Sequence, residues 1–260
     1  MSNIGLKTLL IAITLLISSS TAQPTPPKSF TVVIDAGHGG HDPGTKGKKV
    51  KEKEVALKIA LKLGAYIEKN LPDVKVIYTR KNDRYLGLDE RADIANKAKA
   101  DLFICIHANA IVSAKAYGTE TYVMGLSKDN GNFEIAKREN SVILLDENHE
   151  ERYEGFDPSS PESYILFSLT QSAYQENSLK FAQKVEEQFK SKVGRSSRGV
   201  KQAGFMVLWL TTMPSVLIET GFLSYPKEED FLMSDKGQDL MASGIFRALK
   251  EYKLQLESVN

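Results

Sequence analysis

The sequence predicts an α/β protein: a single domain with a largely parallel sheet covered by helices on both faces. The first observation is the run 30–34, rich in β-branched residues and typical of a strand buried on both faces. The second is that amphipathic helical patterns alternate with further apolar runs, as they do in βαβ units. The third is that 260 residues, 42% of them hydrophobic and 26% charged, suffice for one well-packed domain.

The charge balance argues against one class of partner. Lys and Arg number 34 and Asp and Glu 33, which gives a formal net charge of +1. A protein that binds nucleic acid neutralises many phosphates with a basic face, and this composition provides no such excess. We therefore expect no nucleic-acid partner.

Residues 1–22 have the pattern of a signal peptide. Lys7 precedes the apolar run Leu9–Ile17, and small residues follow up to Ala22. An uncleaved membrane anchor is the less favoured alternative, because the apolar run is short for a bilayer span. We expect cleavage after Ala22, a stiff proline-rich linker over 23–29, and no membrane span in the mature chain. We expect export, to the periplasm in preference to full secretion.

The rest of the chain divides into strand-like and helix-like segments within one domain, 30–255. We expect further strands at 74–78, 101–107, 118–123, 205–208 and 214–222, and helices at 52–70, 88–98, 162–193 and 230–252. Residues 125–161 differ because they are polar and punctuated by glycine and proline, with a helical pattern at 133–145. We interpret them as a helical insertion that lies over one face of the domain.

The lone cysteine, Cys105, cannot form a disulfide within the chain. It could serve as a nucleophile, but its place in the middle of a predicted strand favours an inert, buried thiol.

Polar side chains occur at or near the carboxyl ends of three predicted strands. His38 lies in a glycine-rich loop, His107 ends a second strand and Glu219 lies in the last one, while Glu52 begins the first helix. Because the carboxyl ends of parallel strands share one edge of a sheet, we expect these residues to meet. Two imidazoles and a carboxylate are a usual ligand set for a catalytic zinc, and a further carboxylate can act as general base. The alternative is a tight turn with structural histidines.

The glycine-rich loop 37–44 does not match the common phosphate-binding motifs. It lacks the third glycine of a dinucleotide fingerprint, and no Gly-Lys-Ser or Gly-Lys-Thr follows it.

Four motifs together resemble the zinc-dependent N-acetylmuramoyl-L-alanine amidases of catalytic type 3. They are Val33–Gly40, Glu52–Lys53, Ile106–Ala110 and Pro214–Phe222, and their order and spacing agree over about residues 30–253. The resemblance implies a six-stranded sheet, Zn²⁺ as cofactor and peptidoglycan as substrate. It also implies hydrolysis of the amide between the lactyl group of N-acetylmuramic acid and L-alanine, in wall remodelling or daughter-cell separation.

The resemblance also implies roles for single residues. It makes His38, Glu52 and His107 the zinc ligands and Glu219 the catalytic glutamate. Its register favours Glu52 over Glu54, which is then an ordinary acid in a first helical turn.

Several other polar residues are left with two interpretations. Arg80 and Arg91 match family positions, and either substrate binding or ion pairing that fixes the rim explains them. Asn109 could orient a ligand or face the substrate. We expect His41 to be part of the loop structure and His149 to be solvated.

The insertion has a counterpart in relatives from Gram-negative cell-separation systems, after the same triplet found here at Arg138–Asn140. In those relatives a helix covers the site and a glutamate takes the open zinc position. The resemblance thus implies partial autoinhibition and an activator protein that relieves it; a substrate-contacting flap is the alternative. The blocking glutamate stays open among Glu147, Glu150, Glu151 and Glu154.

Two other functions are compatible with this sequence. One is a zinc peptidase that acts on the stem peptides of peptidoglycan, since the same ligand set suits peptide hydrolysis. The other is a wall-binding protein without catalysis, which the intact set of candidate residues disfavours.

Overall fold

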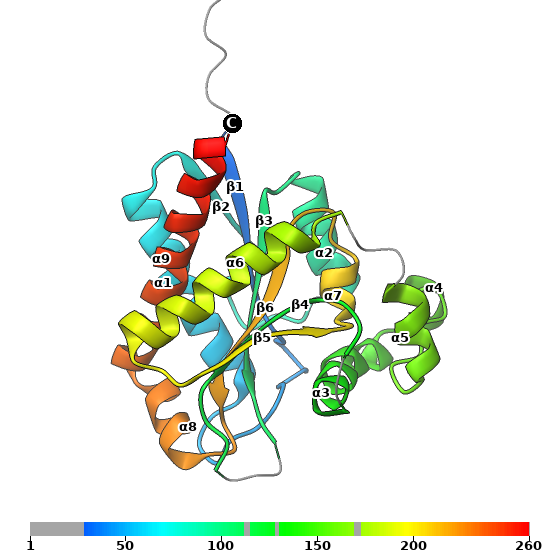
Figure 1. Cartoon of the computed structure of the whole chain (residues 1–260). Coiled ribbons are helices and arrows are strands. Elements are labelled where there is room, and N and C mark those ends of the chain that lie inside the picture. The colour runs from blue at the N-terminus through cyan, green and yellow to red at the C-terminus, as the bar shows by residue number, and fades with distance from the viewer. Residues whose placement is uncertain (1–28, 112–114, 128–129, 169–172, 260) are drawn as a thin grey trace, which may run out of the picture.

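The computed structural model describes residues 29–111, 115–127, 130–168 and 173–259, so the predicted signal peptide and nearly all of the linker lie outside the described residues. In the described part, six strands form one sheet in the order β2-β1-β3-β6-β4-β5 (Figure 1). They are β1 Phe30–Ala36, β2 Val74–Tyr78, β3 Leu102–Asn109, β4 Thr119–Met124, β5 Ser197–Ala203 and β6 Ser215–Phe222.

The first four strands in this order are mutually parallel, and the other two run the opposite way. β4 pairs antiparallel with β6, and β5 pairs parallel with β4. The predicted largely parallel, six-stranded sheet is therefore confirmed.

Helices cover both faces of this sheet (Figure 1). One face packs against α1, α6 and α9, and the other against α2, α7 and the insertion. Side chains of a strand alternate between the two cores: Val32 and Ile34 belong to the first, and Val33 to the second. The bounds are α1 Glu52–Asn70, α2 Leu88–Lys97, α3 Asn130–Asn140, α4 His149–Arg152, α5 Pro161–Ser168, α6 Gln175–Gln188, α7 Met206–Trp209, α8 Pro226–Met233 and α9 Asp235–Val259.

The strand order places a topological switch point between β1 and β3. The chain leaves β1 for β2 on one side and returns to β3 on the other. The loops that follow β1 and β3 therefore diverge there, and such a crevice is where open α/β sheets bind ligands.

One predicted strand is wrong, and several predicted helices are broken. The apolar run at 205–208 forms helix α7, whereas the strand is the preceding, more polar segment β5. A short apolar run cannot be assigned to strand or helix by periodicity alone, and an edge strand needs little apolar content. The predicted helix 133–145 is α3 followed by a 3₁₀ turn at Ser141–Leu145. The long pattern at 162–193 contains α5, α6 and a π-helical turn, and 230–252 falls on α8 and α9.

The insertion 125–161 carries α3, α4 and the start of α5 on the second face of the sheet. Phe133 and Phe156 both pack against the ring of Tyr164, with centroids 5.0 and 5.1 Å from it. Over the described residues, no helix has the length and apolar character needed to cross a bilayer.

Candidate metal centre

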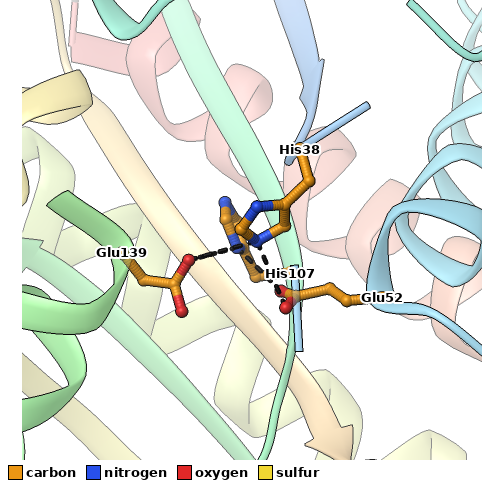
Figure 2. A group of neighbouring side chains, drawn as sticks. All are labelled: His38, Glu52, His107 and Glu139. Carbon is orange, nitrogen blue, oxygen red and sulfur yellow. Dashed lines mark hydrogen bonds and ion pairs between the residues drawn. The ribbon is translucent and has the colours of Figure 1, made fainter. Parts of the chain in front are cut away.

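Four side chains converge at the carboxyl ends of β1 and β3 (Figure 2). His38 lies in the loop after β1, His107 lies near the end of β3, Glu52 is the first residue of α1 and Glu139 projects from α3. One donor atom from each lies within 4.8 Å of the others. The sequence predicted three of these residues to meet, and the structure brings them together; it adds Glu139.

The distances between donor atoms match those around a small cation. His38 Nε2 lies 3.2 Å from Glu52 Oε2 and 3.1 Å from Glu139 Oε2. His107 Nδ1 lies 2.9 Å from Glu52 Oε1 and 3.3 Å from Glu139 Oε2. Tetrahedral zinc with bonds of about 2.0–2.1 Å places its ligand atoms about 3.3 Å apart.

Two of these donor atoms, His38 Nε2 and Glu139 Oε2, are buried and have no hydrogen-bond partner among the described residues. An unpaired buried polar atom is costly, so such a pair facing one point calls for a ligand. Burial alone would raise the pKa of the Glu52 carboxyl, but the nearby His38 lowers it. Burial likewise opposes ionisation of Glu139, and Arg138 with the imidazoles outweighs it and lowers that pKa. Two ionised carboxylates at two imidazoles suit a divalent cation.

The glycine loop makes room for the imidazoles. A Cβ on Gly37 would lie 2.4 Å from His107 Nε2, and one on Gly44, where φ is +65°, would lie 2.5 Å from His38 Cδ2. His38 itself has a φ of +61°, an uncommon backbone conformation that occurs at functional sites. Asp42 Oδ2 lies 2.7 Å from His38 Nδ1, which leaves Nε2 to face the cluster.

Two buried arginines hold the backbone of this loop. The Arg80 side chain donates to the carbonyl oxygens of Gly37 and Lys53, each at 2.8 Å. Arg91 Nη2 donates to the His38 carbonyl oxygen at 2.8 Å. Arg91 also forms an ion pair with the buried Asp35. Of the two interpretations, the one in which these arginines fix the rim agrees with the structure.

Glu219 lies beside the cluster on the neighbouring strand. It is the register partner of His107, so both side chains project from the same face of the sheet. Its two carboxylate oxygens are buried and, within the part of the chain that the structure describes, have no hydrogen-bond partner. Burial, followed by the charges of Glu52 and Glu139, raises the pKa of Glu219 well above its ordinary value. A buried carboxyl group whose pKa is raised, and whose oxygens face a cluster of metal-binding groups, is suited to accept and pass on a proton.

The expectation that the glutamate of the insertion lies among Glu147, Glu150, Glu151 and Glu154 is wrong. All four are exposed, and Glu139 occupies the cluster instead. The sequence feature that marks Glu139 is the triplet Arg138–Asn140, which the family resemblance had already singled out. All three of its side chains form contacts in the structure.

The neighbours of Glu139 in this triplet fix its position. Arg138 donates to Glu139 Oε1 at 2.7 Å and to the Ala110 carbonyl oxygen at 2.7 Å. Asn140 donates to the Gly204 carbonyl oxygen at 2.7 Å and accepts from the Met206 amide at 2.8 Å. The end of α3 is thereby attached to the loop after β3 and to the segment that precedes α7.

The other polar candidates lie outside the cluster. His41 is exposed, and its ring lies 4.1 Å from that of Tyr85. His149 is half-buried in α4 rather than fully solvated, and Glu54 is exposed. Asn109 Oδ1 accepts from Arg138 Nη2 at 3.0 Å, so it contacts the insertion.

The lone cysteine is buried, as predicted. The Sγ of Cys105 lies 2.9 Å from Asp35 Oδ2, and burial raises the pKa of the thiol to about 12. Such a thiol stays protonated, which agrees with an inert role.

Comparison with known proteins decides the family. The family model described as N-acetylmuramoyl-L-alanine amidase matches residues 32–251. The chain belongs to this amidase family. The predicted resemblance is thus confirmed, and with it the class of enzyme, a hydrolase of an amide bond in peptidoglycan.

Curated relatives of this amidase include two from Escherichia coli. AmiC of strain CFT073 is 34% identical over 86% of the chain, which spans 53% of that relative's length. AmiA of strain K12 is 32% identical over 90% of the chain and 81% of the relative. The chain therefore spans about half of the first relative and most of the second.

Solved structures of amidases share the fold. The N-acetylmuramoyl-L-alanine amidase of Clostridium difficile 630 has a TM-score of 0.65 and 31% identity, covering 86% of this chain and 96% of that one. The CwlD amidase of Clostridioides difficile, determined in complex with the GerS lipoprotein, has a TM-score of 0.63 and 26% identity, covering 89% and 100%.

Proposed function

We propose that this amidase is zinc-dependent, with His38, Glu52 and His107 as the protein ligands and Glu219 as the general base. The observation that carries the proposal is the convergence of four donor atoms within 4.8 Å of one another, two of them buried and unpaired. The substrate is the amide between the lactyl group of N-acetylmuramic acid and L-alanine in peptidoglycan.

Each residue then has a defined task. A bound zinc ion would polarise the carbonyl of the scissile amide and lower the pKa of the attacking water. Glu219, with two unpaired oxygens, accepts the proton of that water and passes it to the leaving amine of L-alanine. Asp42 orients the His38 ring through Nδ1.

Digestion of purified peptidoglycan with and without a chelator, followed by mass analysis of the products, tests this function. We expect peptides with a free L-alanine amine, glycan strands without peptide, and loss of both on chelation. Cleavage inside the stem peptides would identify a zinc peptidase instead. Binding without any product would identify a non-catalytic wall-binding protein.

Glu219→Gln tests the assignment of the base. The variant should retain its fold and metal and lose about 100- to 10,000-fold in turnover, because only the proton acceptor is removed. Glu54→Gln is the matched control, since Glu54 is exposed. Digestion by Glu219→Gln at the parental rate would refute this role.

We further propose that the insertion inhibits the isolated enzyme. Glu139 Oε2 lies 3.1 Å from His38 Nε2 and 3.3 Å from His107 Nδ1, where it competes for the coordination position that a catalytic zinc leaves open. This contact supports inhibition over a substrate-contacting flap. An activator protein would then act by binding the displaced form better. The similarity to CwlD, solved with a lipoprotein partner, supports a protein partner.

We propose that the protein is exported and acts in the periplasm. The signal-peptide pattern over 1–22 and a wall substrate support this. Sequencing of the mature amino terminus should find Gln23; an intact Met1 on the bulk of the exported protein would contradict it.

A further inference from the structure

The antiparallel pairing of β4 with β6 brings the start of β4 to the edge that carries the metal centre (Figure 1). Glu120, near the start of β4, is the register partner of Glu219. Register partners project from the same face, so Glu120 lies on the side of the sheet that carries the catalytic glutamate. β5 pairs with β4 beyond it and places its own first residues at this same edge.

Glu120 is almost completely buried and is surrounded by two cations. Its Oε1 accepts from Arg198 Nε at 2.5 Å and from Lys201 Nζ at 2.7 Å, while Oε2 accepts from the Tyr122 hydroxyl at 2.7 Å. The cations lower the pKa of Glu120 against the effect of burial. The carboxylate is therefore ionised, and one negative charge faces two positive ones.

A break in the strand pairing allows both cations to reach the same carboxylate. Residues three apart in a regular strand project to opposite faces, so Arg198 and Lys201 would normally diverge. The register of β4 and β5 shifts between Thr119 and Thr121, and Gly199 has a φ of +87°. Such a bulge inserts one residue and re-aims a side chain, and bulges are over-represented beside active sites. Here it directs Arg198 to the face of Lys201.

Among the described residues, the Arg198 guanidinium makes one hydrogen bond, so most of its donors are available. It uses Nε toward Glu120, and its side chain is 41% exposed, while that of Lys201 is 23% exposed. The ring of Phe222, at the end of β6, lies 5.2 Å from the guanidinium carbon and limits its movement. The two terminal nitrogens of a guanidinium form a planar fork that matches the two oxygens of a carboxylate, and Arg198 is bound to Glu120 through Nε.

We propose that Arg198 and Lys201 form a subsite for a carboxylate of the stem peptide, on the leaving-group side of the scissile amide. This inference rests on the proposed amidase function and names a specificity-determining pair for it. Two strand spacings separate β5 from β6, about 10 Å. Two residues of extended peptide span about 7 Å, so the carboxylate of the residue after L-alanine comes within reach of these side chains.

Two soluble substrates that differ in one group test the subsite. Each is an N-acetylmuramoyl-L-alanyl-D-glutamate γ-methylamide, with the glutamate α-carboxylate either free or converted to a carboxamide. We expect the metal-loaded parent to prefer the free acid by about 10-fold in kcat/KM, mainly through KM, because the contact lies away from the reacting atoms. Arg198→Gln should abolish this preference while hydrolysis of the carboxamide persists. Arg198→Lys should recover part of it, and Lys58→Gln, at an exposed position of α1, should leave it intact.

The alternative, that the two cations only neutralise Glu120, makes a different prediction. Arg198→Gln would then change kcat/KM for both substrates by the same factor, which would overturn the proposal, as would a parent without preference. Calorimetric titration with the two L-alanyl-D-glutamate γ-methylamide products measures the subsite without turnover. If the parent hydrolyses neither substrate, the proposed function fails, and these titrations still decide the subsite: tighter binding of the free acid supports it, and equal binding refutes it.

Discussion

Glu52 and Glu139 both bring a carboxylate to the same two imidazoles, but their surroundings differ. Glu52 accepts from two backbone amides, that of Thr45 at 2.8 Å in the loop after β1 and that of Ala108 at 3.0 Å near the end of β3. Glu139 is held by the side chain of its own neighbour, Arg138, on a helix of the insertion. His38, Glu52 and His107, here called the framework half of the site, are thus held by β3, by the loop after β1 and by the start of α1. Glu139, the insertion half, can leave without breaking a strand. Such an arrangement suits a segment with two positions, one with Glu139 in the cluster and one with Glu139 displaced from it.

The largest effect that we expect is loss of metal from the framework half. His38→Ala or His107→Ala should lower zinc affinity by more than about 100-fold. Even substitution of residues that only orient metal ligands lowers metal affinity about 10- to 100-fold. Metal content after dialysis measures this. His41→Ala is the control, because its exposed ring packs on Tyr85 away from the cluster. One equivalent of zinc in both ligand variants would disprove the ligand set.

The buried pair of Asp35 and Arg91 behind the framework should dominate stability. Asp35→Asn leaves the Arg91 charge unpaired and should lower the free energy of unfolding by about 3–5 kcal/mol. Urea denaturation measures it, with the exposed Asp93→Asn as control. A loss below about 1 kcal/mol would show that the pair is dispensable.

The pH dependence of this difference follows from the pKa of Asp35. Burial would raise that pKa, but Arg91 outweighs burial and lowers it below its ordinary value of about 3.9. The contribution of Asp35 is therefore fully present above about pH 5 and is lost as the pH falls through the lowered pKa. The difference between parent and Asp35→Asn should be constant from pH 5 to 7 and shrink in stronger acid.

Removal of the Glu139 carboxylate should raise activity, whereas removal of a proposed framework ligand should lower it. Glu139→Ala should keep zinc and raise hydrolysis of soluble wall fragments by about 10-fold or more, because a tethered competitor is lost. Glu150→Ala, which removes an exposed carboxylate of the same insertion, should change nothing. Lower activity in Glu139→Ala with intact folding would favour the flap.

The smallest effect concerns the contact between the insertion and α2. Arg152 donates to Asp89 at 2.5 and 3.0 Å, and both side chains are 30% exposed. Such a pair contributes about 0.2–1 kcal/mol, so Arg152→Gln should raise basal activity by no more than about 5-fold and leave metal content unchanged. A rise as large as that of Glu139→Ala would place the control of the site at α4 instead.

The framework half of the site could be predicted because short stretches of sequence mark the strands that carry it. His38 and His107 follow apolar runs whose length and composition indicate buried strands, and parallel strands gather their carboxyl ends. Glu139 could not be assigned, because its place depends on how α3 crosses the sheet, which is set by contacts such as Asn140 with Gly204. β5 was missed because a polar edge strand has no buried run to mark it.

Because Gly37 has no Cβ, the loop after β1 can lie close to the His107 ring. The Cβ of any other residue would lie 2.4 Å from His107 Nε2, about 1 Å inside an ordinary van der Waals contact. The loop backbone at Gly37 therefore lies directly against the ring of His107, a proposed metal ligand on a different strand. A single methyl group at this position would displace the imidazole or the loop, and so would disturb the candidate metal centre without altering any proposed ligand.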